Sequence, residues 1–563
     1  MKKKAVPVLL AVLILIVILG LIAVVSRVVE RYIPSNEWMD SSEYFGIQQE
    51  GQMALILQDQ LLEQKGLLAD GVPYLNMDVV SEYLNDRFYW DSGQELVIYT
   101  TPDSVIKAYA GAQEYTVADS TQTADYVPVR VQDGTAYIAA EFVKQYTAMD
   151  YEVFQDPDRI VITYRYGEVT RADAKRTTQV RELGGIKSPI LTEVSGGEQV
   201  TVLMQMDDWS EVVTADGYIG YVQNSSLGET YTETLTTDFV EPVYTSIHRD
   251  YKINMVWHQV TSQEANDNLL QDIAEMQGVN VISPTWFSIT DNDGNISSLA
   301  DSAYVEAAHG QGLEVWGLVD NFSTEIDTAA VLNNTASRER LAEQLVNAAL
   351  EYNLEGINVD FELIPEDAAD GYIQFLREIS IRCRANSLVL SVDNPVPMEF
   401  NTHYNLNAQG EVVDYVIIMG YDEHYVGSEP GSVASISFVT DGVTKALEEG
   451  VPAEKTILAV PFYTRLWQTD TSGNVTSEAY GMDAAQAVVN DNGAVASWNE
   501  ETAQDYAEFT GADGSFFQIW LENEASLEEK LKLVQQYELG GAAAWKLGFE
   551  RASVWAIMEE YTS

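Results

Sequence analysis

The chain has 563 residues, too many for one ordinary hydrophobic core, so we expect several domains. It carries 31 Lys and Arg against 87 Asp and Glu, and the formal net charge of −56 disfavours nucleic acid and anionic membrane surfaces as partners. Hydrophobic residues make up 46% of the chain, enough to build cores despite this charge. The single cysteine, Cys383, excludes an intrachain disulfide and is interpreted as a packed small hydrophobic residue.

Residues 1–31 are predicted to form a cytoplasmic tip and a transmembrane anchor. Three lysines follow Met1, and the stretch from Ala5 to Val25 is almost purely apolar and long enough to cross a bilayer as a helix. A cleavable signal peptide is the alternative, but the run ends in Val-Val-Ser-Arg and not in small residues of an Ala-x-Ala kind. We therefore predict a single-pass protein of the cell membrane whose residues after about Arg31 are extracytoplasmic.

Residues 40–170 are expected to form short strands with small helices, arranged as an internal repeat. Each copy runs turn, strand, helix, strand, turn and strand, the first over 70–99 and the second over 133–162. The pattern resembles the repeated module named from the N-terminal domain of copper amine oxidases. Neither copy has the spacing of metal ligands, so a spacer or wall-contacting module is the interpretation.

Residues 176–228 contain closely spaced short strands. The last of them, Gly217–Val222, reads Gly-Tyr-Ile-Gly-Tyr-Val. This order of strands resembles the bacterial SH3-like domains of the cell envelope, which implies a location more than a reaction. Residues 233–241 are expected to be a linker to the largest part of the chain.

In residues 245–563, apolar runs of strand length alternate with helical periodicity, as βα units do. Eight such runs predict the α/β class and a (β/α)8 TIM barrel. The runs are 253–257, 279–286, 314–319, 356–362, 388–392, 413–421, 456–463 and 541–545. The one long gap, 467–525, predicts an α+β insertion after the seventh strand, on the catalytic side of the barrel.

The fourth run carries Asn358, Asp360 and Glu362 at alternate positions, so their side chains share one face. Burying carboxylates costs several kcal/mol unless they are paired, so this pattern indicates a functional site; a half-exposed edge strand with a solvated polar face is the alternative. Active sites of such barrels lie at the C-terminal ends of the strands. The residues at the other run ends are mostly aromatic, namely Trp257, Trp286, Phe287, Tyr421, Asp422, Tyr463, Arg465 and Trp545.

Aromatic rings that alternate with carboxylates predict a sugar-binding groove, because pyranose faces stack on indole rings while hydroxyls need a few polar partners. For each aromatic residue taken alone, a place in the core is the alternative interpretation. Their joint position at the strand ends favours the groove.

Residues 245–563 resemble glycoside hydrolase family 18, the chitinase-like enzymes. Residues 355–362 are similar to the signature Asp-Gly-x-Asp-x-Asp-x-Glu, and 419–422 match Met-x-Tyr-Asp of the sixth strand. Residues 461–467 are similar to Pro-x-Tyr-Gly-Arg-x-Trp of the seventh strand, and Trp545 supplies the tryptophan of the eighth. The amino-acid sequence of the whole region resembles the branch of this family that is found in bacterial spore-cortex and cell-wall glucosaminidases.

The resemblance implies substrate-assisted retaining hydrolysis of β-linked N-acetylhexosamine polymers. Glu362 would protonate the leaving oxygen and then activate water, and Asp360 would hold the acetamido N–H. Tyr421 would donate a hydrogen bond to the acetamido oxygen, and Trp545 would form the floor of the subsite. The remaining predicted substrate-binding residues are Asn358, Asp422, Met419, Tyr463, Arg465, Trp257 and Trp286.

Two positions depart from the family pattern. Glu355 stands where the signature begins with Asp, and Asn358 stands where the family has a second Asp that shares a proton with the third. The second change removes a charge beneath Asp360 and is expected to lower activity or to shift the pH optimum. Members that became lectins lose the position of Glu362, which is retained here.

No metal or cofactor is predicted. Residues 291–295 resemble the start of a calcium loop but lack its glutamate, so a hairpin turn is expected, and the five histidines are scattered without ligand spacing. The predicted partner is a polysaccharide, either peptidoglycan or a chitin-like glycan. A non-catalytic glycan-binding protein on the same barrel, silenced through Asn358, and a structural envelope protein are the alternatives.

Overall fold

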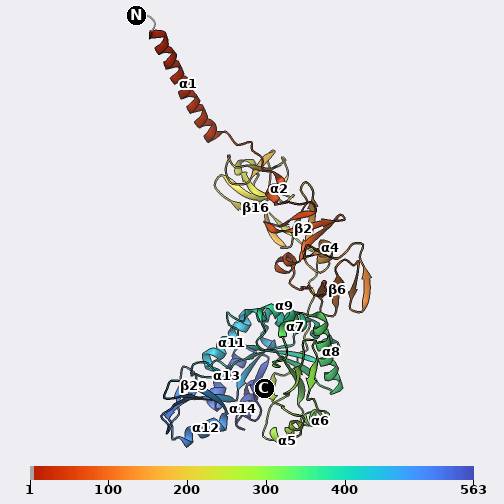
Figure 1. Ribbon diagram of the computed structural model, residues 1–563, viewed down its shortest axis with the longest axis vertical. Coiled ribbons are helices and arrows are strands. Elements are labelled where there is room, and N and C mark those ends of the chain that lie inside the picture. Colours follow the sequence, from red (N-terminus) through yellow and green to blue (C-terminus); the bar gives the residue numbers. More distant parts are fainter. Residues whose placement is uncertain (1–4) are drawn as a thin grey trace. The chain divides into compact units, whose positions relative to one another are not determined.

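The computed structural model describes residues 5–563, which form two compact units (Figure 1). The first unit contains residues up to 90 together with 95–97 and 107–241, and the second contains 91–94, 98–106 and 242–563. The predicted cytoplasmic tip, Met1–Lys4, lies outside the described residues.

Helix α1 (Ala5–Tyr32) contains the apolar run. Its segment Leu9–Val29 has a mean hydropathy of 3.3, and none of it is buried inside the protein. By length and composition this helix is able to cross a membrane, and a signal sequence near an N-terminus has the same properties.

The two copies of the predicted repeat have the expected order of elements. In the first copy, β3 (Val72–Asn76) leads through a short helical stretch to the hairpin of β4 (Phe88–Asp91) and β5 (Leu96–Thr100). In the second, β10 (Thr135–Ala139) leads through α4 (Ala140–Lys144) to the hairpin of β11 and β12. Both copies open with Asp-Gly, and all four residues have φ between 52° and 80°, as the tight hairpin turn demands.

The module and the region after it each contain a seven-stranded sheet. The first sheet has the order β11-β12-β1-β2-β3-β10-β9, and the second has the order β15-β14-β18-β17-β16-β13-β19. The second sheet includes β13 (Gly167–Asp173), and β19 pairs with β13, so the expected linker at 233–241 starts inside a strand. The remaining bounds are α2 Ser41–Phe45, β1 Gln52–Leu57, β2 Gln60–Ala69, α3 Met77–Val79, β6 Val105–Tyr109, β7 Glu114–Val117, β8 Ser120–Thr123, β9 Val129–Gln132, β11 Asp150–Phe154, β12 Arg159–Thr163, β14 Thr178–Arg181, β15 Ile190–Val194, β16 Gln199–Gln205, β17 Trp209–Val213, β18 Ile219–Gln223 and β19 Tyr231–Leu235.

The second unit is a closed eight-stranded parallel barrel, which confirms the predicted fold class (Figure 1). Its strands match the eight predicted runs, and β20 pairs with both β21 and β33 to close the ring. The strands are β20 Ile253–His258, β21 Val281–Ile289, β23 Glu314–Asp320, β24 Gly356–Asp360, β25 Val389–Pro395, β26 Tyr415–Met419, β27 Thr456–Pro461 and β33 Gly541–Trp545, with β22 (Ile296–Ser298) paired to β21. The helices are α5 Leu269–Asp272, α6 Ser302–Gly310, α7 Thr328–Leu332, α8 Thr335–Glu351, α9 Ala369–Ala385, α10 Leu406–Val412, α11 Ile436–Glu448, α13 Glu524–Gln536 and α14 Val554–Thr562.

Side chains of the barrel strands alternate between two buried layers. Met255, Leu318 and Ile417 belong to the inner cluster, which fills the barrel. Their neighbours Val256 and Ile418 belong to the larger cluster that packs against the surrounding helices. Because both faces of each strand are buried, the strands read as continuous apolar runs in the sequence, and an inward polar residue is therefore conspicuous.

The predicted insertion is present between β27 and α13. It is a five-stranded antiparallel sheet of order β29-β28-β32-β31-β30 with one helix, α12 (Met482–Asp491). It starts from the C-terminal end of β27, which is the catalytic side of the barrel. The strands are β28 Tyr463–Thr469, β29 Val475–Gly481, β30 Ser497–Asn499, β31 Gln504–Thr510 and β32 Phe516–Leu521.

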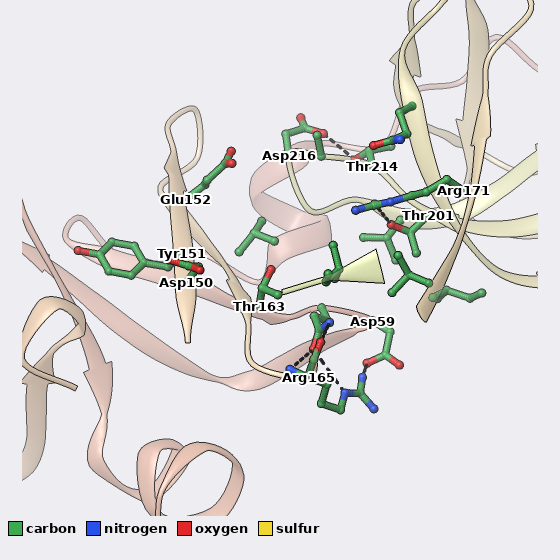
Figure 2. Close-up of a pocket in the computed structure, with 18 of the residues that line it drawn as sticks. Asp59, Asp150, Tyr151, Glu152, Thr163, Arg165, Arg171, Thr201, Thr214 and Asp216 are labelled. Atoms are coloured by element: carbon green, nitrogen blue, oxygen red, sulfur yellow. Dashed lines mark hydrogen bonds and ion pairs between the residues drawn. The ribbon is translucent and has the colours of Figure 1, made fainter. Parts of the chain in front are cut away.

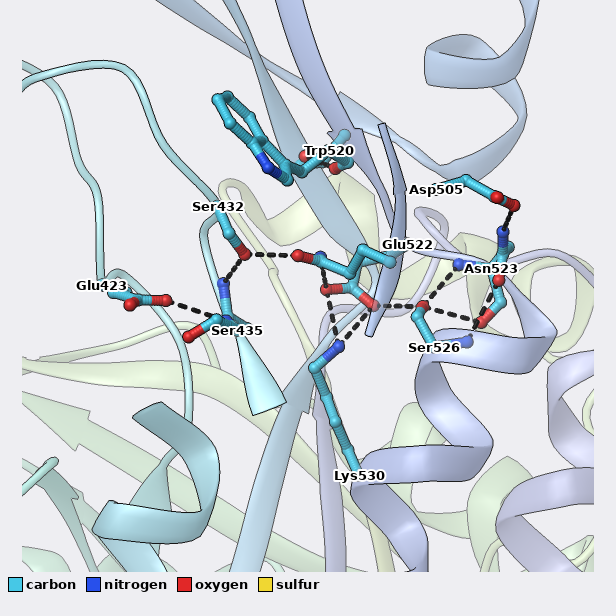
Figure 3. A network of polar contacts seen from close by, with 12 residues as sticks. Glu423, Ser432, Ser435, Asp505, Trp520, Glu522, Asn523, Ser526 and Lys530 are labelled. Atoms are coloured by element: carbon cyan, nitrogen blue, oxygen red, sulfur yellow. Dashed lines mark hydrogen bonds and ion pairs between the residues drawn. The ribbon is translucent and has the colours of Figure 1, made fainter. Parts of the chain in front are cut away.

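A buried polar network fastens the insertion to the barrel (Figure 3). Glu522 follows β32, and both of its carboxylate oxygens accept hydrogen bonds of 3.0 Å from Lys530 Nζ of α13. Gln504 of β31 donates to Glu522 Oε1 at 2.6 Å and accepts from the Ser432 hydroxyl at 2.5 Å. Ser526 donates to Glu522 Oε2 at 2.7 Å. The ion pair is buried and hydrogen-bonded, so losing one partner leaves an uncompensated charge.

Lys530→Met is therefore expected to lower the free energy of unfolding by about 3–5 kcal/mol, because it leaves Glu522 charged and buried without its cation. The measurement is urea unfolding of the full chain in mild detergent, followed by tryptophan fluorescence. Lys532→Met is the matched control, since Lys532 pairs with Glu528 and Glu529 on the solvated face of the same helix and should change stability by less than about 1 kcal/mol. Equal stabilities of the two variants would contradict the role of the network.

The second unit also includes a short stretch of the repeat module. Asp91, at the end of β4, is buried, and its Oδ2 accepts hydrogen bonds from the backbone N–H (3.0 Å) and the hydroxyl (2.5 Å) of Thr335, the first residue of α8. Tyr244 donates to the carbonyl oxygen of Thr100 at 3.2 Å, and Arg384 donates to that of Pro102 at 3.0 Å. A fragment that begins near residue 242 lacks all three acceptors.

Asp91→Ala should therefore destabilise the barrel by about 1–2 kcal/mol, because it leaves the buried backbone N–H of Thr335 without its acceptor. A double-mutant cycle with Thr335→Ala isolates the contact, because partners in contact give non-additive effects. Strict additivity in unfolding experiments would show that the two residues do not interact.

Candidate active site

Asn358 lies on β24 inside the barrel and is fully buried. Its Oδ1 accepts hydrogen bonds from Trp257 Nε1 (2.9 Å) and the Ser283 hydroxyl (3.2 Å). Its Nδ2 donates to the Ser391 hydroxyl (3.0 Å) and to Asp393 Oδ1 (2.9 Å). The amide thus uses its full hydrogen-bonding capacity within the protein. No hydrogen-bonding group of Asn358 is left for a ligand in this structure, and the amide supports the layer above it.

Asp360 follows Asn358 on the same face of β24 and is 6% exposed. Its Oδ1 is buried and has no hydrogen-bond partner among the described residues. Burial raises the pKa of Asp360 well above its usual range, and the negative charges of Asp393, Glu362 and Asp320 raise this pKa further. Asp360 therefore lies where several acids meet without a balancing cation.

Glu362 stands just beyond the end of β24, and its backbone is held in place by Asn321. The Glu362 N–H donates to Asn321 Oδ1 and Asn321 Nδ2 donates to the Glu362 carbonyl oxygen, both at 2.9 Å. The carboxylate is open to solvent on one side, while the walls around it desolvate it in part. This desolvation, together with the charges of Asp422 and Asp320, raises the pKa of Glu362, which suits a group that must donate a proton.

Tyr421 and Tyr463 lie beside this pair of acids. Their rings are 6.1 Å apart and inclined at 72°, and the Tyr463 hydroxyl donates to Asp422 Oδ1. The Tyr421 hydroxyl has no protein partner among the described residues, so it is free to bind a ligand. Asp422 has a φ of 60°, a backbone conformation that few non-glycine residues adopt. Met419, which ends β26, is half-buried.

Tyr463 and Arg465 do not lie on the seventh barrel strand, where they were predicted. That strand ends at Pro461, and Tyr463 begins β28 of the insertion. Arg465 donates to the Ser477 hydroxyl at 3.3 Å, and its buried Nε lacks a partner among the described residues. The insertion therefore supplies one wall of the site.

The three predicted tryptophans have different surroundings. Trp545, at the end of β33, is partly exposed, and its ring lies 6.0 Å from that of Trp257 at an angle of 58°. Trp257 is buried and donates to Asn358, so it supports Trp545 and does not face the groove. Trp286 belongs to the cluster between strands and helices, and its Nε1 donates to Asn266 Oδ1 at 2.9 Å.

Trp257 and Trp286 are thus both buried within the protein, and neither indole is open to a ligand. Trp286 lies three residues after Ser283, whose side chain points inward to Asn358, so alternation along β21 places Trp286 on the outer face of the barrel, against the helices.

Several residues of the site were not predicted. Asp393 is 1% exposed on β25, directly beside β24, and Asp320 ends β23 on the other side of β24. Asp320 accepts hydrogen bonds from the Ser288 hydroxyl (2.8 Å) and the backbone N–H of Phe322 (3.1 Å). Each acid is the first polar residue after a predicted apolar run, and this signal could have identified both.

Large apolar side chains project from the loops after four consecutive strands, β23 to β26. They are 54–91% exposed, which is unusual for residues of this size, and their loops lie at the C-terminal end of the barrel. The residues are Phe322, Leu363, Phe400, Tyr425 and Val426. We call this set the apolar rim.

A cavity of about 1050 Å³ lies within the first unit, away from these acids (Figure 2). Arg165 is paired with Asp59, and Arg171 with Thr201 and Glu233. The other charged side chains that line it are acidic, namely Asp150, Glu152, Glu168, Glu193, Glu198 and Asp216.

Within residues 5–563 no group of three or more His, Cys, Asp or Glu residues could hold a metal ion. Residues 291–295 form the expected hairpin turn between β21 and β22, in which Asp291 accepts hydrogen bonds from the backbone of Asp293 (3.0 Å) and Asn295 (3.2 Å). Cys383 is buried in α9, and burial raises the pKa of its thiol.

An eight-stranded parallel barrel with an acid at the end of its fourth strand, flanked by aromatic residues, defines a glycosidase of the TIM-barrel class. Residues 316–550 match the model of the glycosyl hydrolases family 18, and the barrel is similar to that of chitinase-like glycoside hydrolases. Residues 57–163 match the copper amine oxidase N-terminal domain, and 176–228 match the bacterial SH3 domain. The predicted resemblances are thus confirmed.

The chain is similar to the uncharacterized glycosylase YvbX of Bacillus subtilis (strain 168), with 26% identity over 297 residues, 50% of this chain and 85% of that protein. It is 27% identical over 247 residues to the cortical fragment-lytic enzyme of the same organism, which covers 42% of this chain and 57% of that enzyme. The crystal structure of a chitinase from Chromobacterium violaceum ATCC 12472 superposes with a TM-score of 0.50 and 25% identity, covering 55% of this chain and 98% of that one.

The raised pKa of Glu362 gives a pH prediction. Glu362 stays protonated to higher pH than an ordinary glutamic acid. Asp320→Asn removes one of the negative charges that raise the pKa of Glu362. The alkaline limb of the pH dependence of kcat/KM for glycoside hydrolysis should therefore move to lower pH in Asp320→Asn. Asp441→Asn, on the exposed side of α11, is the control and should leave the limb in place. A limb that stays fixed or moves upward in Asp320→Asn would contradict the assignment.

Proposed function

We propose that the protein is a membrane-anchored, extracytoplasmic glycosidase that cleaves peptidoglycan, at β-linked N-acetylhexosamine, by substrate-assisted retaining hydrolysis. The observation that carries this proposal is the arrangement at the end of β24. There an accessible acid of raised pKa, Glu362, and a nearly buried acid, Asp360, share one face beside the unpartnered hydroxyl of Tyr421.

In the first step, Glu362 protonates the leaving glycosidic oxygen. The acetamido oxygen of the sugar before the cut attacks the anomeric carbon, while Asp360 accepts a hydrogen bond from the acetamido N–H and Tyr421 donates one to the acetamido oxygen. Glu362, now ionised, then takes a proton from the water that opens the cyclic intermediate. Trp545 supports the sugar ring from below.

The other acids near Glu362 are poorly placed to act as the nucleophile. Asp393, on β25 beside β24, is only 1% exposed, and Asp320 is held by Ser288 and by the backbone of Phe322. Asp422 accepts the hydroxyl of Tyr463. This leaves the substrate's own acetamide as the attacking group, in keeping with the family mechanism.

Four features favour a cell-wall polymer as the substrate. One relative is named a cortical fragment-lytic enzyme, and an SH3 domain of the bacterial type precedes the barrel. The apolar rim would offer contacts to sugar units beyond the one that is attacked. Helix α1 would hold the enzyme at the outer face of the membrane, next to the wall. We assign 1–31 to the tip and anchor, 40–170 and 176–228 to the two β-rich domains, and 245–563 to the catalytic domain.

A glycan-binding protein without catalysis is the second candidate, and the amide at Asn358 favours it because the family pattern has a carboxylate there. Glu362→Gln separates the two candidates. The amide keeps the shape of the side chain but has no proton to donate, so release of fragments from purified peptidoglycan should fall by at least a hundredfold while binding is retained. Mass spectrometry of the released fragments measures the first quantity and co-sedimentation the second. Glu366→Gln, an exposed acid nearby, serves as the control.

The role of the acetamide has its own test. Peptidoglycan that has been chemically de-N-acetylated should still bind but should not be cleaved, because it lacks the internal nucleophile. Rapid cleavage of that material by the wild-type enzyme, or normal turnover by Glu362→Gln, would refute the mechanism.

A further inference from the structure

Asp393 is a buried acid that no part of the mechanism above uses. It lies on β25, whose register with β24 pairs Asn358 with Ser391 and Val359 with Val392, so the next two residues, Asp360 and Asp393, are neighbours. Both strands alternate, and both acids point to the inside of the barrel. Adjacent strands lie about 4.8 Å apart, which brings the two carboxyl groups close to each other.

The surroundings of the two acids hold no compensating cation. Among the described residues, no Lys, Arg or His forms an ion pair with Asp360 or Asp393. The titratable groups that face them are acids or phenols, namely Glu362 of the same strand end, Asp320 of β23, Tyr372 of α9, Tyr404 before α10 and Tyr421 after β26. Two buried carboxylates without a cation cannot both remain ionised at low cost, so a proton is held between them.

The hydrogen bonds give the two acids different roles. Asn358 donates its N–H to Asp393 Oδ1 at 2.9 Å and thereby fixes the orientation of Asp393. Asp360 Oδ1 is buried and has no donor among the described residues, which is costly for a buried acceptor. A proton shared with a neighbouring carboxyl supplies the missing donor.

We propose that Asp393 is the proton partner of Asp360 and that the two acids together hold one proton. Asp393 carries this proton whenever Asp360 is ionised and accepts the hydrogen bond of the acetamido N–H. The proton leaves an oxygen of Asp360 and binds an oxygen of Asp393, and no other bond changes. Asp393 is thus a positioning residue. From the neighbouring strand it supplies the second carboxyl group that is missing at position 358, where this chain has Asn. The kinetic part of this inference rests on the proposed function.

The first experiment counts protons and needs no substrate. Burial raises the pKa of both acids in the folded protein, and the charges of Asp393 on Asp360 and of Glu362 on both raise them further, so the folded chain retains a proton that the unfolded chain releases above about pH 4. The slope of unfolding free energy against pH, measured between pH 6 and 8 on the full chain in detergent, gives the number of retained protons. Wild type and the double variant Asp360→Asn/Asp393→Asn should differ by one proton. A difference of two, or of none, overturns the proposal.

The second experiment moves the carboxyl group. Asp393→Asn should lower kcat on N-acetylated peptidoglycan by about tenfold or more while KM stays within about twofold, because Asp393 does not touch the sugar. The swap Asn358→Asp/Asp393→Asn returns an acid to the face of Asp360 and should recover most of kcat. A purely structural role for Asp393 would not be rescued by the swap, and that result overturns the proposal.

The two proposals fail in distinguishable ways. If the wild type does not cleave N-acetylated glycan, the proposed function fails, and the proton count still decides whether Asp360 and Asp393 share a proton. If the wild type cleaves and the proton count differs by two or by none, the function stands and the pairing fails.

Discussion

The catalytic face of the barrel depends on the four hydrogen bonds of one buried amide. Asn358 joins β24 to β20 through Trp257, to β21 through Ser283, and to β25 through Ser391 and Asp393. Fully satisfied buried networks of this kind fix a single arrangement of the groups that belong to them. The acids next to Asn358 are therefore supported by a rigid layer of side chains, although their own charges repel one another.

The fold could be predicted because its physical basis is repeated eight times. Strands that are buried on both faces give continuous apolar runs, and each run was found at the position of a barrel strand. The polar residues of β24 were recognisable for the same reason, since an inward carboxylate interrupts such a run. The point where a strand ends is less visible, and Tyr463 begins a new strand that continues the apolar pattern of β27.

The sequence did not show which side chains of different strands contact one another. Trp286 has the position of a groove residue in the sequence, but it lies on the opposite face of β21 from the inward Ser283, and its indole packs against Asn266. Asp393 and Asp320 follow apolar runs of their own, but only the register of β23, β24 and β25 shows that they surround Asp360. Asn321 clamps the backbone of Glu362 from 41 residues away, and no spacing in the sequence indicates this contact.

The way in which the insertion is attached determines how the groove can behave. Its first strand, β28, carries Tyr463 and Arg465, and the pair of Glu522 and Lys530 ties the same sheet to α13. Through Gln504 and Ser432 the loop after β26 belongs to the same network. This side of the groove is thus built as a fixed wall and not as a lid that closes over a substrate. A fixed wall spends little conformational entropy when a ligand binds, which would suit the proposed action on an immobile polymer.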